Sequence, residues 1–331
     1  MTQRPLRQGP LRLGSRRSPM AVEQSRQVAG MITERTGRRV EIVGVTTQGD
    51  VSRAQLSQIG GTGVFVSALR EALLAGEVDL AVHSLKDLPS GSAPGIVLAA
   101  VPPRDDPRDA LVARDGAKLA DLPVGARIGT GSPRRAAQLL GLRRDLRCVP
   151  IRGNDGTRLR QVTEGALEGV VLACAGLARI GQAGAITQVF DPDEMLPAPG
   201  QGALAVECRD GDPELIALLQ SVSDEASLAA VTAERSLLEA LGAGCSAPIG
   251  GYAAGTEQLR MRAVVLSTDG TRALRVTGSA PAADARRLGR DLAAELLRRG
   301  ASDLVSVPAS SAPTSSASTS REPTSSGNDV Q

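Results

Sequence analysis

Between about residues 10 and 200, short apolar runs alternate with stretches of helical periodicity. This alternation indicates an α/β fold, in which helices connect the strands of mainly parallel sheets. Helices are expected to begin at Ser18-Pro19 and Ser132-Pro133, because serine caps a helix and proline suits its first turn. A further amphipathic helix is expected at 63–74. We expect strands at 11–14, 40–45, 79–83, 96–100, 127–129, 147–151, 169–173 and 203–208.

Two proline-rich segments, 101–107 and 196–202, interrupt this alternation and predict two crossovers between two lobes that face a shared cleft. From about residue 225 the pattern changes to a helix up to 241, a glycine-rich turn, strands near 260–266 and 272–279, and a helix over 282–299. We therefore expect two doubly wound α/β lobes and a small α+β C-terminal domain. The domains are expected at 10–103 with 203–222, at 108–197 and at 225–307. The Ser/Thr/Pro-rich segment 308–331 is expected to be a disordered tail.

Composition excludes several classes of function. With 38 Lys+Arg against 36 Asp+Glu, the chain lacks the basic excess of a nucleic-acid-binding protein, and 1% aromatic residues cannot form base-stacking platforms. The apolar stretches are far shorter than the roughly 18–20 residues that span a bilayer, and the basic N-terminus has no secretory apolar region. One histidine and four cysteines without a CxxC pair indicate no metal site and reduced thiols. We expect a cytoplasmic protein with no membrane or nucleic-acid partner.

Two strand-to-helix turns resemble each other and predict anion sites. The first is GSRRSP, with Arg16 and Ser18, and the second is GTGSPRR, which begins at Gly129. Each brings hydroxyl groups, free backbone N–H groups and arginines to a helix N-terminus. Simple helix capping with solvated arginines would explain one such turn, but a pair of them, one in each lobe, favours anion binding. The second turn contains Thr130, Ser132, Arg134 and Arg135.

Further arginines follow predicted strands in the second lobe. Arg152 and Arg158 lie in the segment IRGNDGTR, and Arg179 follows the strand at 169–173. Ligands of open α/β sheets bind at the carboxyl ends of strands, so these side chains predict a cleft rich in guanidinium groups. Its ligand should carry several carboxylates or phosphates. No GxxxxGK[ST] or GxGxxG motif occurs, which argues against a nucleotide.

Two further segments contain reactive groups. The segment HSLKD holds His83, which is the sole histidine, and Lys86, one of two lysines; Asp87 could act as a general acid and base there. A solvated turn after a strand is the alternative. Cys245 lies in the loop GAGCSAPIGG, where a thiol is accessible for covalent chemistry, although an accidental cysteine explains this loop equally well. The remaining cysteines are expected to be packing residues. They are Cys148, Cys174 and Cys208.

Taken together, these segments resemble the porphobilinogen deaminase (hydroxymethylbilane synthase) family. The resemblance covers about residues 11–302 in the order of the family, and AVHSLKDLP and GAGCSAPIG are its most specific motifs. The other matching segments are LRLGSRRSP, TTQGDV, DDPRDA, IGTGSPRR, IRGNDGTRL, LPAPGQGALAVECR and LAAELLRRGA. The family fold consists of two lobes like those of periplasmic binding proteins and a third domain that carries a cofactor loop.

The resemblance implies an enzyme that condenses four porphobilinogen molecules head to tail, releases ammonia at each step, and frees hydroxymethylbilane by hydrolysis. Its cofactor is a dipyrromethane, which the family attaches through a thioether to the cysteine matching Cys245. Asp87 matches the catalytic aspartate. The resemblance further implies a monomer whose product passes to the next enzyme of tetrapyrrole biosynthesis. Cofactor-binding positions are implied at Lys86, Asp87, Thr130, Ser132, Arg134 and Arg135, and substrate-binding positions at Arg16, Ser18, Phe65, Arg152, Arg158 and Arg179.

One position departs from the family pattern, and two other functions compete with the enzyme. Thr62 stands where bacterial members usually have lysine, which affects one carboxylate contact or loop closure but not the reaction class. A non-catalytic two-lobed carboxylate-binding protein would use the same arginines, but it gives no reason for the Cys245 loop. A ligand-sensing regulator would need a DNA-binding module, and no basic helix-turn-helix is evident.

Overall fold

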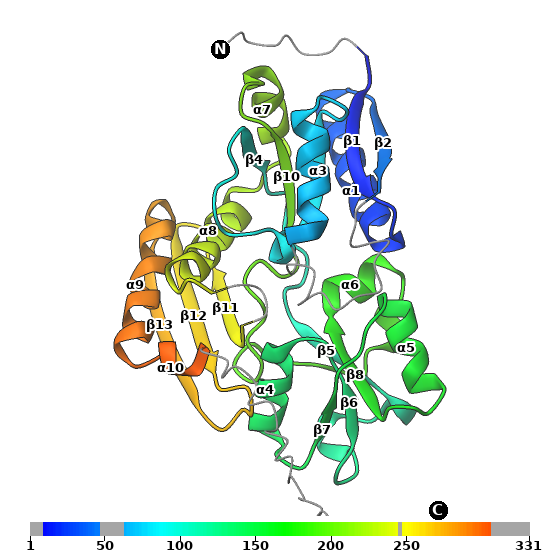
Figure 1. Ribbon diagram of the computed structural model, residues 1–331, viewed down its shortest axis with the longest axis vertical. Helices are drawn as coiled ribbons and strands as arrows, with labels where there is room; N and C mark the ends of the chain where they lie inside the picture. The colour runs from blue at the N-terminus through cyan, green and yellow to red at the C-terminus, as the bar shows by residue number, and fades with distance from the viewer. Residues whose placement is uncertain (1–8, 47–62, 244–246, 306–331) are drawn as a thin grey trace, which may run out of the picture.

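The computed structural model describes residues 9–46, 63–243 and 247–305, and these residues form three separate sheets. Figure 1 shows the first sheet in the upper part of the molecule, the second below it, and the third beside both. The two larger sheets have five strands each and the third has three.

The first sheet has the strand order β2-β1-β3-β10-β4. Strands β2, β1 and β3 pair in parallel, whereas β10 is antiparallel to both of its neighbours. The sheet is doubly wound: Leu80 and Val82 of β3 pack toward α1 and α7, and Ala81 packs toward α3. Its elements are β1 (Leu11–Arg16), α1 (Pro19–Thr36), β2 (Val40–Val45), α3 (Gly63–Leu74), β3 (Leu80–Ser84), β4 (Ile96–Ala100), β10 (Leu204–Arg209) and α7 (Pro213–Gln220).

The second sheet repeats this topology in the order β7-β6-β8-β5-β9. Strands β7, β6 and β8 are parallel, and β5 is antiparallel to β8 and β9. Leu111 and Val171 pack with Leu139 of α4 on one face, while Val112 and Val170 pack with residues of α5 and α6 on the other. Its elements are β5 (Asp109–Ala113), β6 (Arg127–Gly129), α4 (Pro133–Leu142), β7 (Arg147–Val149), α5 (Asp155–Thr163), β8 (Gly169–Ala173), α6 (Cys174–Arg179) and β9 (Gln188–Val189).

The mainly parallel sheets expected from the sequence are therefore mixed sheets. In each lobe, three strands pair in parallel. The strand that follows a crossover, β10 in the first lobe and β5 in the second, is antiparallel to its neighbour among them. The crossover 101–107 leads into β5 of the second sheet, and the crossover 196–202 leads into β10 of the first. Strand β5 was not predicted, because its short run DALVA directly follows the charged crossover.

The third unit is a three-stranded antiparallel sheet with helices packed against it. Helices α8 and α9 can pack closely because Gly289 has no side chain. A Cβ at this position would lie 2.1 Å from the carbonyl oxygen of Ala233. Strand β11 was not predicted from the sequence IGGYAA, whose glycines weaken a strand pattern. Its elements are α8 (Glu225–Ala240), β11 (Ile249–Ala254), β12 (Gln258–Leu266), β13 (Ala273–Pro281), α9 (Ala285–Arg298) and α10 (Ser302–Val305).

Short 3₁₀ helices complete the described chain. They are η1 (Leu85–Asp87), η2 (Arg114–Gly116), η3 (Leu119–Asp121), η4 (Ala183–Ala185) and η5 (Ala282–Asp284). Among the described residues, no single helix combines the length and apolarity needed to cross a membrane; α7 and α8 pass that test only as a pair bent by 110°. The fold class expected from the sequence is confirmed as two doubly wound α/β lobes with a small α+β C-terminal unit.

A buried ion pair joins both crossovers to the third unit. Glu234 of α8 is fully buried, and its carboxylate accepts two hydrogen bonds from Arg104 at 2.7 and 3.1 Å. The same carboxylate accepts from the backbone N–H groups of Gly200 at 2.6 Å and Ala253 at 2.8 Å. A carboxylate this deep is stable only with such a full set of donors. Glu234 thus fixes the three units to one another at one point.

Candidate active site

The short helix η1 carries Lys86 and Asp87 at the end of β3. Leu85 is buried and anchors η1, while Lys86 and Asp87 remain partly exposed. The Lys86 Nζ lies 3.4 Å from the Oε1 of Gln201, which belongs to the second crossover. Burial lowers the pKa of Lys86, the charge of Arg135 lowers it further, and nearby carboxylates, including that of Asp87, oppose both effects. The strand end thus places an ammonium beside a carboxylate, facing the second lobe.

The predicted anion turn of the second lobe is a capped helix N-terminus. The Ser132 hydroxyl accepts from the N–H of Arg135, and the Thr130 hydroxyl accepts from the N–H of Ser132 at 3.2 Å. Arg134 and Arg135 are buried rather than solvated, and both pair with Asp109 of β5, at 2.7 and 2.8 Å. The turn therefore combines a helix N-terminus with two guanidinium groups held by one carboxylate.

Asp109 is the counter-ion that the sequence analysis missed. Burial opposes its ionisation, but the charges of Arg134 and Arg135, with hydrogen bonds from Arg134 and Gln201, hold the pKa of its carboxyl far below the ordinary range. A buried charge needs a partner, so two arginines at a helix start required a carboxylate nearby. The motif DDPRDA contained it, but the sequence did not show which of its aspartates was buried.

The N-terminus of α5 adds a further cation to the same place. Asn154 caps the helix by accepting from the N–H of Thr157 at 2.9 Å. Burial lowers the pKa of Arg158, the charge of Arg135 acts in the same direction, and Asp155 and Asp87 oppose it. Arg158 therefore lies within the electrostatic reach of Asp87, across the two lobes. Arg152, in contrast, is exposed.

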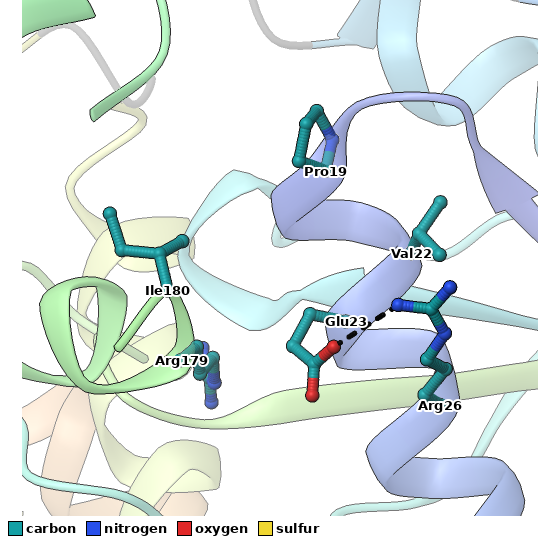
Figure 2. Close-up of a pocket in the computed structure, with 6 residues that line it drawn as sticks. All are labelled: Pro19, Val22, Glu23, Arg26, Arg179 and Ile180. Atoms are coloured by element: carbon teal, nitrogen blue, oxygen red, sulfur yellow. Dashed lines mark hydrogen bonds and ion pairs between the residues drawn. The ribbon is translucent and has the colours of Figure 1, made fainter. Parts of the chain in front are cut away.

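Arg179 lies where the two lobes meet on another side. Its Nη2 is 2.8 Å from Asp105 of the first crossover and 2.9 Å from the carbonyl oxygen of Gly202 in the second. Figure 2 shows Arg179 facing α1 across a cavity of about 490 Å³. The cavity is lined by Pro19, Val22, Glu23, Arg26, Arg179 and Ile180. The Ser18 hydroxyl caps α1 by accepting from the backbone N–H of Ala21, and Arg16 ends β1.

The structure thus brings Lys86, Asp87, Arg135 and Arg158 together, while Arg179, Ser18 and Arg16 lie near the contact of α1 with α6. Three predicted positions cannot be placed. Cys245 and Thr62 lie outside the described residues, as does the side chain of Phe65 in α3.

The sole histidine does not join this cluster. His83 is buried in β3 with its Nε2 3.2 Å from Glu207 of β10, which also accepts two hydrogen bonds from Arg70 of α3. Burial alone would raise the pKa of Glu207, but His83 and Arg70 bring it down to about 2. The group of His83, Glu207 and Arg70 therefore ties β3 to β10 and α3 behind the segment that carries Lys86 and Asp87.

Two family models match most of the chain. Residues 11–217 match "Porphobilinogen deaminase, dipyromethane cofactor binding domain", and residues 228–298 match "Porphobilinogen deaminase, C-terminal domain". The chain belongs to the porphobilinogen deaminase family. Among its relatives, the porphobilinogen deaminase of Thermobifida fusca is 57% identical over 307 residues, covering 90% of this chain and 96% of that protein. The porphobilinogen deaminase of Mycobacterium tuberculosis is 48% identical over 305 residues, covering 89% and 98%.

A comparison with solved structures finds matches to part of the chain. One is a substrate-binding protein of an ABC transporter from Coxiella burnetii, 17% identical with a TM-score of 0.40, covering 64% of this chain and 91% of that one. Another is the methionine-binding protein MetQ, 13% identical with a TM-score of 0.42, covering 63% and 87%.

As a porphobilinogen deaminase, the chain is a transferase of porphyrin biosynthesis that uses porphobilinogen and binds a dipyrromethane cofactor. The rings of that cofactor carry acetate and propionate groups, for which guanidinium and ammonium groups are suitable donors. Within the described residues, the buried Nε atoms of Arg134 and Arg179 have no hydrogen-bond partner, so donors are available for carboxylates. The residues present therefore fit the cofactor.

Proposed function

We propose that the chain is a hydroxymethylbilane synthase that condenses four porphobilinogen molecules on a dipyrromethane primer and then releases the linear product by hydrolysis. The observation that carries this proposal is the position of Asp87, beside Lys86 and within electrostatic reach of Arg158 of the opposite lobe. One carboxylate among several cations is suited to proton transfer on a substrate whose own carboxylates are bound by those cations.

Asp87 is the proposed general acid and base. In its acid form, its carboxyl gives a proton to the departing amine, so that the carbon–nitrogen bond breaks and ammonia leaves. The carboxylate then takes the proton from the pyrrole α-carbon at which the new carbon–carbon bond has formed. Each cycle thus returns Asp87 to its starting state. The bound cofactor supplies the free pyrrole α-position at which the chain of rings grows.

The cations are proposed to hold the carboxylates. Lys86 and the turn around Ser132 would bind the cofactor, with Thr130, Arg134 and Arg135. Arg16, Ser18, Phe65, Arg152, Arg158 and Arg179 would bind substrate and growing chain. Each added ring brings two carboxylates, so a local concentration of arginines suits a chain whose overall net charge is only +2. Cys245 is the proposed thioether anchor.

We also propose the domain boundaries, the cellular location and the oligomeric state. The three domains comprise 10–103 with 203–222, 108–197 and 225–307, and the enzyme acts as a cytoplasmic monomer. Its linear product is passed to the next enzyme of the pathway.

Intact mass spectrometry with peptide mapping tests the function directly. We expect the purified protein to exceed its sequence mass by two linked pyrrole units, located on the Cys245 peptide. If the mass is unmodified, adding porphobilinogen should generate the adduct. A protein that binds porphobilinogen but never acquires the adduct would support the non-catalytic carboxylate-binding protein instead.

A further inference from the structure

Gln201 occupies a tight turn of the second crossover, between two glycines with left-handed backbone. Gly200 has φ 76° and Gly202 has φ 88°. A Cβ at Gly200 would lie 2.3 Å from Leu85 Cδ2, and a Cβ at Gly202 would lie 2.4 Å from the carbonyl oxygen of Asp105. Only glycines allow the backbone to approach η1 and the first crossover this closely. The turn therefore presses the side chain between them, Gln201, into the junction of the two lobes, where it is 1% exposed.

Both the nitrogen and the oxygen of the Gln201 side-chain amide form hydrogen bonds. Its Nε2 donates to the carbonyl oxygen of Pro107 at 2.7 Å and to Asp109 Oδ1 at 2.9 Å. Its Oε1 accepts from Lys86 Nζ and from Arg135 Nη2, each at 3.4 Å. The reverse orientation of the amide would set donors against two cations and an oxygen against a carboxylate, so the chemistry of the neighbours fixes it.

We propose that Gln201 is a positioning residue, which sets Lys86 of the first lobe against Arg135 of the second. This inference rests on the proposed function, in which Lys86 and Arg135 bind carboxylates of the cofactor. Gln201 acts through these two cations. Its amide oxygen gives both of them a shared acceptor, and its amide nitrogen ties that acceptor to Asp109, the counter-ion of Arg135.

The size and the polarity of glutamine are both required by this arrangement. A methionine would fill the space but leave Asp109 and the two cations without the shared amide. A glutamate would attract Lys86 and Arg135, but it would set an oxygen against Asp109 Oδ1 and the Pro107 carbonyl, where a donor now lies. The two substitutions should therefore shift the pKa of Lys86 in opposite directions.

The two lysines of the chain, Lys86 and Lys118, allow a direct test by NMR titration of the protein carrying its cofactor and labelled with [ε-¹³C]lysine. Among the described residues, the charged groups that act on Lys86 include Arg135, Asp87, Asp109 and Asp155. We expect Gln201→Met to lower the pKa of Lys86, because an acceptor that stabilises the ammonium is lost, and Gln201→Glu to raise it. The exposed Lys118 serves as the internal control, and its titration should be the same in both variants. An unchanged Lys86 titration in both variants would overturn the inference, and if one variant does not fold, the other still decides.

A double-mutant cycle then tests the coupling in kcat/KM. If Gln201 acts through Lys86 as well as Arg135, Gln201→Met should reduce kcat/KM at least about fivefold alone and clearly less in a Lys86→Met background. Gln138→Met is the matched control, because Gln138 is also buried and, within the described residues, its side chain bonds only to the backbone of Leu196, at 2.8 and 3.0 Å. It should lower stability and leave the Lys86 titration unchanged.

The two ways of failing are distinguishable. If Lys86→Met itself leaves kcat/KM unchanged, the role proposed for Lys86 is wrong. If Lys86→Met reduces kcat/KM but the Gln201 and Lys86 effects multiply independently, Lys86 keeps its role and the positioning role of Gln201 is wrong.

Discussion

At the residue scale, the junction of the lobes gives two carboxylates different surroundings. Asp109 is fully buried and accepts from Arg134, Arg135 and Gln201, so it serves as a permanent counter-ion. Asp87 is partly exposed, and its charge acts on Lys86 and Arg158. Only the second environment suits a group that must gain and lose a proton in every cycle.

Asp87→Asn should separate chemistry from binding. An amide of the same size keeps the packing of η1 but cannot transfer the proton, so kcat should fall by about 100-fold or more. Intact mass should still show the cofactor. Asp115→Asn is the control, since Asp115 has φ 57° in an exposed turn and asparagine tolerates that conformation. Wild-type turnover of Asp87→Asn would refute the acid–base role.

Cys245→Ser should yield protein without a covalent adduct, because a serine hydroxyl cannot form the thioether. Peptide mapping after incubation with porphobilinogen measures this. Cys148→Ser is the matched control and should retain the adduct, because burial raises the pKa of the Cys148 thiol and leaves it unreactive. An adduct that persists in Cys245→Ser would move the anchor to another cysteine.

At the element scale, β3 and β10 decide where η1 lies. They pair antiparallel from Leu204 opposite Ser84 to Cys208 opposite Leu80, and the group of His83, Glu207 and Arg70 locks the pair to α3. Strand β10, which follows the second crossover, therefore supports the segment that carries Lys86 and Asp87.

This arrangement predicts an acid dependence of stability. The pKa of Glu207 is lowered from 4.5 to about 2, so its ionised form stabilises the fold fully above pH 4.5, and this contribution is lost as pH falls toward 2. Glu207→Gln should be less stable at neutral pH, because Arg70 and His83 lose their buried partner. Its unfolding free energy should also fall less steeply over that pH window. Urea titrations at several pH values measure this.

Glu71→Gln is the control for that experiment, since Glu71 is exposed on the same helix as Arg70. Its acid dependence should match the wild type. An acid dependence in Glu207→Gln as steep as that of the wild type would show that other carboxylates govern this window.

At the scale of the whole molecule, the two crossovers and the third unit converge on Glu234. The β12–β13 turn also reaches the second lobe, where a Cβ at Gly270 would lie 2.2 Å from the carbonyl oxygen of Ala137 in α4. The third unit thus contacts both crossovers and α4, so its packing affects the geometry at which the two lobes meet.

Glu234→Gln should therefore destabilise the whole molecule. Leaving Arg104 as a buried charge without its carboxylate should cost about 3–5 kcal/mol. Differential scanning calorimetry should show a lower midpoint and a broader or divided transition, as the third unit uncouples from the lobes. Glu239→Gln, on the same helix but about half exposed, is the control and should unfold like the wild type. A single unshifted transition in Glu234→Gln would contradict the role of this ion pair.

The sequence by itself determined the class of fold, the helix starts and the candidate groups. Serine–proline caps and apolar runs are local signals, and they predicted α1, α4 and most strands within a few residues. The motifs also placed Asp87, the arginines and Cys245 in the family pattern. The tertiary structure decided which charges pair. Asp109, Gln201 and Glu234 meet partners between 19 and 130 residues away, and no local period encodes such contacts. Burial requires that each charge have a partner, but only the folded chain selects it.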